Sequence, residues 1–208
     1  MKKIIGIVGF AGSGKSTVGE YLKQNLGFEQ LSFAESLKDA VSSIFGWPRH
    51  MLEGDTPESR EFREQKDEWW SKKLNRDVTP RWALQYMGTD VIRDGLDDNI
   101  WIFSVERKLS QTDKSIVITD VRFPNEIQMI HKLGGKILRI VRGAEPIWYK
   151  TALMANKGSK SAKAELEELG VHASEWSWIG EYDKEIHNNY SVSALFKSVE
   201  AWLNESLP

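Results

Sequence analysis

A glycine-rich loop with one lysine and one serine is the part of this sequence best suited to chemistry. Residues 9–16 read GFAGSGKS and satisfy the complete Walker A spacing. Glycines let successive backbone N–H groups curl around phosphate oxygens, and a helix N-terminus directly after them adds a favourable dipole. The loop therefore predicts a binding site for a nucleoside triphosphate.

The positions of this loop have distinct expected roles toward ATP and Mg²⁺. Lys15 is expected to reach the β- and γ-phosphates, and the Ser16 hydroxyl is expected to ligate Mg²⁺. The remaining residues of the predicted ATP site are Gly12, Ser13, Gly14 and Thr17. The alternative is a chance glycine turn before a helix, which the strand–loop–helix context disfavours.

Asp120 is a second candidate for chemistry because it closes the apolar run SIVITD. A carboxylate at the carboxyl end of a parallel strand points into the crevice where such sheets bind ligands. Asp120 could hold Mg²⁺ through water or accept a proton. It could also cap the helix expected to begin near Pro124, and the two roles are compatible.

These residues need strands and helices to position them, and the apolar pattern supplies both. Residues 4–8 form a continuous apolar run typical of a strand buried on both faces, and 15–26 show helical spacing. Strand-like and helical segments then alternate, which predicts an α/β fold of the P-loop NTPase type: three layers, α/β/α, around a mainly parallel sheet. The further strands are expected near residues 28–33, 115–119 and 136–141, and the further helices near 35–45, 101–109, 123–133 and 193–203.

A middle helix is predicted to start at Pro80, with Thr79 as its cap and Gly88 as its stop. Arg81, Gln85 and Gly88 recur at intervals of four and three residues and therefore share a face of this helix. Arginine can fork onto a monophosphate, and glutamine presents a donor and an acceptor to a base edge. A solvent-facing surface with an ordinary C-cap is the alternative.

Two polar segments interrupt the pattern, at about residues 46–80 and 143–171. We interpret the first as an acceptor-binding lobe and the second as a lid inserted into a single domain of residues 1–208. The core of that domain would comprise about 1–45, 81–142 and 172–208. Four lysines of the second segment could face ATP or solvent: Lys150, Lys157, Lys160 and Lys163.

Composition limits the classes of function. The 28 Lys and Arg residues balance 30 Asp and Glu residues, giving a net charge of −2 and no indication of a nucleic-acid or membrane surface. The absence of cysteine excludes disulfides and thiolate metal sites. We expect a cytoplasmic protein, in the host cytoplasm if phage-encoded, with small nucleotides as partners; the composition leaves open whether it forms a homodimer.

Five stretches together carry a resemblance to a known family. In order they are GFAGSGKST, FAESLKDA, RWALQYMGTD, NIWIF and TDVRFPNE. Their order and spacing resemble the deoxynucleoside monophosphate kinases of tailed bacteriophages, which are relatives of the adenylate-kinase-like P-loop kinases. The resemblance runs to about Arg142, resumes at HASE (172–175), and is weak in both polar segments. This chain has Lys-Ser at the end of the loop where some phage members have Lys-Asp, so the magnesium ligand is kept.

The resemblance implies roles for individual residues. It places Arg81, Gln85, Gly88 and Thr89 in the acceptor nucleotide site, with Trp101 stacking on the base; without the resemblance, core packing is the better reading of Trp101. It assigns Asp120, Arg122 and Glu126 to the active site. There Arg122 could neutralise charge on the transferring group, and Glu126 could orient Arg122 or bind a sugar. An Arg122–Glu126 surface ion pair is the alternative.

Other matched positions are less defined. Lys38 is implied to face the acceptor and Arg142 to approach ATP, whereas Arg63 and Lys66 are more simply solvated cations. His172 and Glu175 match a recurring element that could be a capping box.

The reaction implied is transfer of the ATP γ-phosphate to a deoxynucleoside monophosphate. A P-loop kinase for another acceptor, such as dephospho-coenzyme A or a sugar, is the nearest rival. The rival from another class is a nucleic-acid-linked ATPase or switch. Such a protein is expected to carry a basic surface, and the balanced charge of this chain gives no indication of one.

Overall fold

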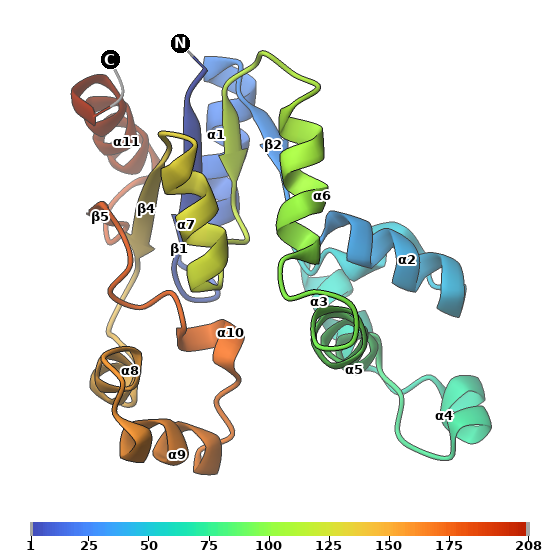
Figure 1. The fold of residues 1–208 in the computed structure, drawn as a ribbon. Helices are drawn as coiled ribbons and strands as arrows, with labels where there is room; N and C mark the ends of the chain where they lie inside the picture. Colours follow the sequence, from blue (N-terminus) through green and yellow to red (C-terminus); the bar gives the residue numbers. More distant parts are fainter. Residues whose placement is uncertain (1, 207–208) are drawn as a thin grey trace. The chain divides into compact units, whose positions relative to one another are not determined.

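The computed structural model describes residues 2–206. In that range the chain forms one sheet of five parallel strands in the order β2-β3-β1-β4-β5 (Figure 1). This confirms the expected α/β fold with a parallel sheet. The strands are β1 (Ile4–Val8), β2 (Glu29–Leu31), β3 (Ile116–Ile118), β4 (Lys136–Val141) and β5 (Lys184–His187).

The central strand β1 explains why the sheet is covered on both faces. Because side chains alternate along a strand, Ile5 and Ile7 join the core with Val18 of α1 (Lys15–Leu26) and Leu195 of α11 (Val192–Ser206). Gly6 points the other way, where an added Cβ would lie 2.7 Å from Ile130 of α7 (Pro124–Lys132). The close approach of α7 therefore requires glycine at this position, and the three expected layers are present (Figure 1).

One strand was not anticipated. β5 reads KEIH, and Ile186 alone among its residues is buried. It lies at the edge of the sheet and pairs with β4, with Ile140 opposite Ile186. An edge strand that buries one side chain has too little apolar alternation to be recognised.

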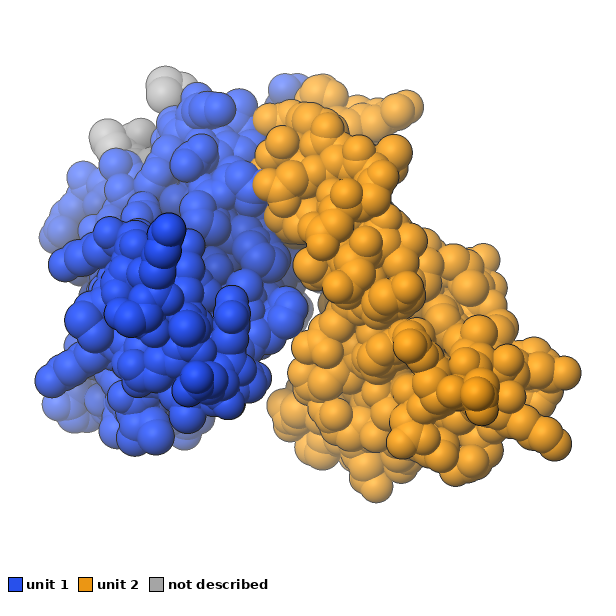
Figure 2. Space-filling model, turned by 60° about the horizontal axis from the view of Figure 1, so that its bottom comes forward, with its two compact units in different colours: residues 1–31, 112–208 blue, residues 32–111 orange. Residues whose placement is uncertain are grey.

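Contacts divide the chain into two compact units, which Figure 2 colours separately. Unit 1 comprises residues 1–31 and 112–208, and unit 2 comprises residues 32–111. The acceptor lobe expected at 46–80 falls inside unit 2, and the domain organisation predicted above stays a prediction. The elements of unit 2 are α2 (Glu35–Phe45), η1 (Arg49–Leu52), α3 (Pro57–Glu64), α4 (Glu68–Leu74), α5 (Pro80–Gln85), η2 (Tyr86–Arg93) and α6 (Ile100–Leu109).

The middle helix begins as predicted but ends differently. Thr79 caps α5 by accepting a hydrogen bond from the Trp82 amide at 3.1 Å. The expected stop at Gly88 is wrong, because the helix widens into the π-helical turns of η2 and continues to Arg93. Gly88 is instead buried, and a Cβ there would lie 2.6 Å from Leu37. The glycine permits close helix packing rather than ending a helix.

The polar segment at 143–171 is mostly helical. It contains α8 (Tyr149–Asn156) and α9 (Lys160–Glu168), which pack on each other and bury Ala155 and Leu166, and a short α10 (Ala173–Trp176) follows. Its four lysines are all exposed. In the described part of the chain, no helix is long and apolar enough to cross a membrane.

Candidate active site

The glycine loop lies between β1 and α1 and is shaped by its own backbone. Gly12 and Gly14 adopt φ values of 76° and 110°, which other residues rarely accept. A Cβ at Gly9 would lie 2.5 Å from the Ile140 carbonyl oxygen, so the loop runs close against β4. Lys15 Nζ donates to the carbonyl oxygens of Gly9 and Phe10 at 2.7 and 2.8 Å. The Lys15 side chain therefore connects the end of the glycine loop to its beginning.

Several groups of this loop suit a polyphosphate. The buried Ser13 hydroxyl has no hydrogen-bond partner among the described residues, and the space beside Gly12 is open. Helix α1 begins at Lys15 after the N-cap Gly14. It has no side-chain cap and no acidic residue in its first turn, so its positive end is not compensated within the helix. Ser16 and Thr17 are exposed in that turn. The loop thus offers donors and positive potential to an anion.

The charge around Lys15 comes from residues distant in sequence. Burial and the nearby Arg122 guanidinium lower the pKa of Lys15 to about 8, while Glu175 and Asp120 act in the opposite direction. Asp120 follows the end of β3 by two residues, as expected for a carboxylate at the carboxyl edge of the sheet. Unit 1 therefore brings Lys15, Asp120 and Arg122 into one electrostatic environment, and their catalytic roles stay a prediction.

The side chains of Arg122 and Glu126 have different hydrogen-bond partners. Arg122 Nη1 donates to Glu175 Oε1 at 3.0 Å and to Ser174 Oγ at 3.4 Å. Glu126 is 2% exposed, and its carboxylate accepts hydrogen bonds from the backbone amides of Arg122 and Phe123 at 2.7 and 3.1 Å. Glu126 thereby satisfies amides at the start of α7 and fixes the backbone that carries Arg122. A sugar-binding role for Glu126 stays a prediction.

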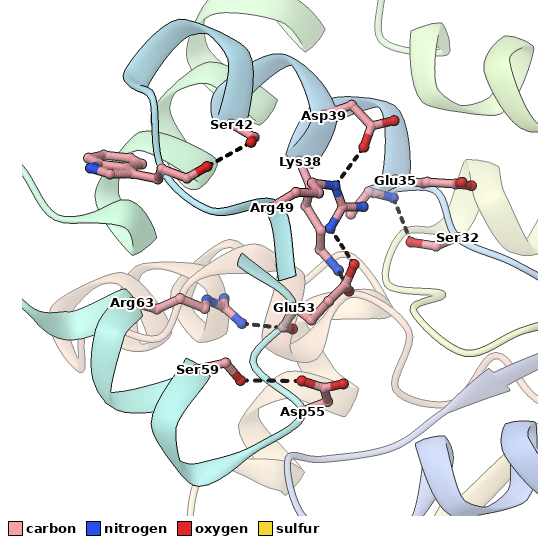
Figure 3. Close-up of polar contacts among 12 residues, drawn as sticks. Ser32, Glu35, Lys38, Asp39, Ser42, Arg49, Glu53, Asp55, Ser59 and Arg63 are labelled. Carbon is pink, nitrogen blue, oxygen red and sulfur yellow. Dashed lines mark hydrogen bonds and ion pairs between the residues drawn. The ribbon is translucent and has the colours of Figure 1, made fainter. Parts of the chain in front are cut away.

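Lys38 belongs to a group of charges in unit 2 (Figure 3). Lys38 Nζ lies 2.5 Å from Glu53 Oε2, and Arg49 bonds the other oxygen of the same carboxylate. Although burial opposes ionisation, these two cations lower the pKa of Glu53. Arg63, for which the sequence favoured solvation, donates to the Glu53 carbonyl oxygen at 3.3 Å. Lys38 is therefore a charge-paired residue within unit 2.

The residues predicted on the middle helix have unequal surroundings. Arg81 forms an ion pair with Glu64, and Gln85 is exposed at the end of α5. Trp101 is 8% exposed, and its Nε1 donates to the Gly88 carbonyl oxygen at 3.0 Å. That contact ties α6 to η2, which also carries Thr89. In this structure Trp101 serves packing, so its stacking on a base stays a prediction.

Two arginines near the end of β4 contrast sharply. Arg142, which the resemblance placed near ATP, is exposed. Arg139 has a side chain only 3% exposed and lies between Glu185 (2.6 Å) and Glu145. Its Nη1 also donates to the hydroxyls of Tyr149 and Tyr182 at 2.7 and 3.2 Å. Of these two arginines, Arg139 is therefore the one that is buried and held by ion pairs and hydrogen bonds.

Comparison with known proteins identifies the family of this chain. The sequence profile described as deoxynucleotide monophosphate kinase matches residues 49–166, more than half of the chain. The chain belongs to the deoxynucleotide monophosphate kinase family. As a family member it is a nucleoside monophosphate kinase, a phosphotransferase whose kinase chemistry implies ATP and nucleotide substrates. The glycine loop lies outside the matched range and is supported by its geometry.

Individual relatives of this family member agree. It is 36% identical over 151 residues to a protein of Acanthamoeba polyphaga mimivirus to which deoxynucleotide monophosphate kinase activity has been assigned; the match covers 67% of this chain and 74% of the relative. It is 38% identical over 56 residues to the deoxynucleoside-5'-monophosphate kinase of Escherichia phage T5, a match covering 26% of this chain and 22% of that enzyme.

Some solved structures align with most of this chain at low identity. Shikimate kinase from Aquifex aeolicus is 15% identical with a TM-score of 0.46, over 97% of this chain and 96% of that one. Dephospho-CoA kinase from Campylobacter jejuni is 16% identical with a TM-score of 0.42, over 98% and 97%. The family assignment does not depend on these likenesses.

Sequence reasoning on this kinase missed Asn188, which directly follows β5. Its Nδ2 donates to the Ser13 carbonyl oxygen at 2.9 Å, and the same atom would lie 2.6 Å from a Cβ at Gly14. This contact fixes the Ser13 carbonyl group of the glycine loop to the residue that follows β5. No local signal identifies Asn188, because its partner is far away in sequence and β5 itself was not recognised.

We expect Asn188→Ala to raise the KM for ATP by about 5–10-fold, as the loss of one well-formed hydrogen bond of about 1 kcal/mol would do. The KM for the acceptor should change less than twofold. Steady-state kinetics with each substrate varied in turn measure both values. The control is Asn204→Ala, which removes an exposed amide at the far end of α11. Equal changes in both KM values would contradict this role.

Proposed function

We propose that this kinase transfers the γ-phosphate of ATP to the 5'-phosphate of a deoxynucleoside monophosphate. An acceptor phosphate oxygen forms a bond to the γ-phosphorus as the bond to the β–γ bridging oxygen breaks, giving ADP and a deoxynucleoside diphosphate. The observation that carries the proposal is the glycine loop spanned by Lys15, in a chain of the deoxynucleotide monophosphate kinase family. Phosphoryl transfer needs little covalent help from the protein, so alignment and charge neutralisation are its tasks.

The ATP half of the reaction is assigned to unit 1. Lys15 would turn from the loop carbonyls to the β- and γ-phosphates, while the amides of residues 12–17 surround the phosphate oxygens. Ser16 and Asp120 would hold Mg²⁺, since a hydroxyl and a carboxylate are the hard oxygen ligands that this ion takes alongside phosphates and water. Bound Mg²⁺ would supply positive charge to the triphosphate. Arg122 would neutralise charge on the transferring group.

The acceptor half is assigned to unit 2. Lys38 and Arg81 are the candidate cations for the monophosphate, and each is paired with a carboxylate, Glu53 and Glu64 respectively. Binding of the acceptor would exchange these carboxylates for phosphate oxygens. The exposed amide of Gln85 is the candidate for reading a base edge, with Thr89 nearby on η2.

An ADP-release assay with ATP, Mg²⁺ and each monophosphate in turn tests this function. Deoxyribo- and ribonucleotides of every base are compared. Turnover confined to deoxynucleoside monophosphates supports the proposal. Turnover only with dephospho-coenzyme A or a sugar would replace the acceptor, and hydrolysis stimulated by DNA would replace the class of reaction.

Gln85→Ala is expected to raise the KM for the preferred monophosphate about 10-fold, because a bidentate amide–base contact contributes about 1–3 kcal/mol. The KM for ATP should change less than twofold. Kinetics with the acceptor and ATP varied separately give both numbers. Gln111→Ala, an exposed glutamine at the end of unit 2, serves as the matched control. A parallel rise in both KM values would argue against base reading by Gln85.

A further inference from the structure

The stretch HASE, residues 172–175, has a defined construction. His172 precedes the short helix α10, and its Nδ1 accepts the Ser174 amide at 3.2 Å while lying 2.9 Å from Ser174 Oγ. The histidine is therefore the cap of α10. The Glu175 carboxylate does not complete this cap in the described contacts, because Glu175 Oε1 accepts Arg122 Nη1 at 3.0 Å. The helix presents Ser174 and Glu175 to one nitrogen of Arg122.

We propose that Glu175 is a positioning residue that fixes the Arg122 guanidinium for phosphoryl transfer. This inference rests on the proposed function and goes beyond it by assigning a role to a residue outside the nucleotide site. Glu175 would act through Arg122 and touch neither nucleotide.

The exposure of the pair argues for positioning rather than stability. The side chains of Arg122 and Glu175 are 48% and 44% exposed. An ion pair in such a setting contributes about 0–1 kcal/mol to stability. Its main effect is to restrict a long, mobile side chain to one orientation. Since a guanidinium has five N–H donors and these contacts use Nη1, donors remain available for a phosphate.

The segment that carries Glu175 is itself held firmly. Asn156 Nδ2 of α8 donates to the carbonyl oxygens of Trp176 and Ile179 at 3.2 and 2.8 Å. Trp178 is buried, and its ring centre lies 5.1 Å from that of Phe10 in the glycine loop. Glu175 is therefore attached to the same framework as Lys15. Because Glu175 holds Arg122, the position of the Arg122 guanidinium is fixed relative to the loop that would bind the γ-phosphate.

Charge gives a second reason for a carboxylate at this position. Lys15 and Arg122 are cations close enough to influence each other, and both are assigned to the same phosphate. Glu175 offsets their repulsion before ATP arrives. A neutral side chain of similar shape would keep the orientation but not this compensation.

The test compares kcat and KM of Glu175→Ala, Glu175→Gln, Arg122→Ala and the double variant Glu175→Ala/Arg122→Ala. We expect Glu175→Ala to lower kcat about 10–100-fold, the cost of a misplaced catalytic group, with the KM for the acceptor changed less than twofold. Glu175→Gln should recover most of kcat, because its amide oxygen still accepts Nη1. In the Arg122→Ala background, Glu175→Ala should have no further effect. Glu168→Ala, an exposed carboxylate of α9, is the control.

A full additional loss from Glu175→Ala in the Arg122→Ala background would overturn the inference, as would unchanged kcat in Glu175→Ala. A second measurement does not need an acceptor: ¹⁵N relaxation of the Arg122 Nε–H group in the free protein. Its order parameter should fall below about 0.6 in Glu175→Ala. An unchanged order parameter would overturn the inference even if the acceptor were not a deoxynucleotide, so the two proposals can fail separately.

Discussion

Lys15→Ala is expected to lower kcat/KM for ATP by at least about 100–1000-fold, the loss seen when a preorganised donor to developing charge is removed. The amine is the cation of the glycine loop, and it is already drawn to the inner side of the loop by two carbonyl oxygens. The residues next to it in the sequence cannot replace it, because Ser16 and Thr17 carry no charge. ADP release with the best monophosphate measures the loss.

Stability separates loss of chemistry from loss of fold in this variant. Burial and Arg122 lower the pKa of Lys15 to about 8, so its amine stays mostly protonated at neutral pH, but holding this charge costs more free energy in the folded state than in the unfolded chain. Removing that charge offsets the two lost hydrogen bonds, and the Tm should stay within a few degrees of the original. Lys23→Ala, in the last turn of the same helix, should leave activity intact. Retention of a third or more of the activity by Lys15→Ala would reject the assigned role.

Arg139→Leu is expected to lower the free energy of unfolding by about 2–3 kcal/mol, which corresponds to roughly 5–10 °C in Tm for a chain of this size. The change removes a cation that is 3% exposed and leaves Glu145 and Glu185 without it. The cost is below that of a fully buried pair because both carboxylates are about a third exposed. Tyr149 and Tyr182 also lose a donor.

Arg142→Ala supplies the matched control three residues along the chain. Its side chain is exposed, so its removal should change stability by less than about 0.5 kcal/mol. If Arg142 approaches ATP as the resemblance implies, the KM for ATP should rise in Arg142→Ala while its Tm stays unchanged. Equal Tm values for Arg139→Leu and Arg142→Ala would contradict the structural role of Arg139. Thermal unfolding monitored by circular dichroism provides the comparison.

The elements closest to the phosphate chemistry were the most predictable. The run Ile4–Val8, the loop and the helix Lys15–Leu26 were predicted with their observed bounds, because a strand buried on both faces and a helix with regular apolar spacing are strong local signals. The position of Asp120 followed from the end of the next strand. These features depend on residues that are near one another in sequence.

The features that escaped prediction depend on distant partners. Gly88 looked like a helix stop, but its packing against Leu37 and its bond to Trp101 favour a continued helix. Glu126 looked like the partner of the Arg122 side chain, whereas it accepts the Arg122 amide and the guanidinium bonds Glu175. In each case tertiary contacts outweigh local propensity.

The place of unit 2 in the chain has a consequence for folding order. β2 and β3 are neighbours in the sheet, with Glu29 opposite Ile116, yet all of residues 32–111 come between them. During synthesis β1 and β2 are completed early. Neither can pair with β3, the neighbour of both strands in the sheet, until residues 32–111 have also been synthesised. Closing a loop becomes costlier as its flexible length grows, by about 0.6 kcal/mol for each doubling. If unit 2 folds first, its internal contacts shorten that flexible length. Early folding of the inserted unit is therefore expected to speed completion of the sheet and to limit the time during which its unpaired apolar strands could aggregate.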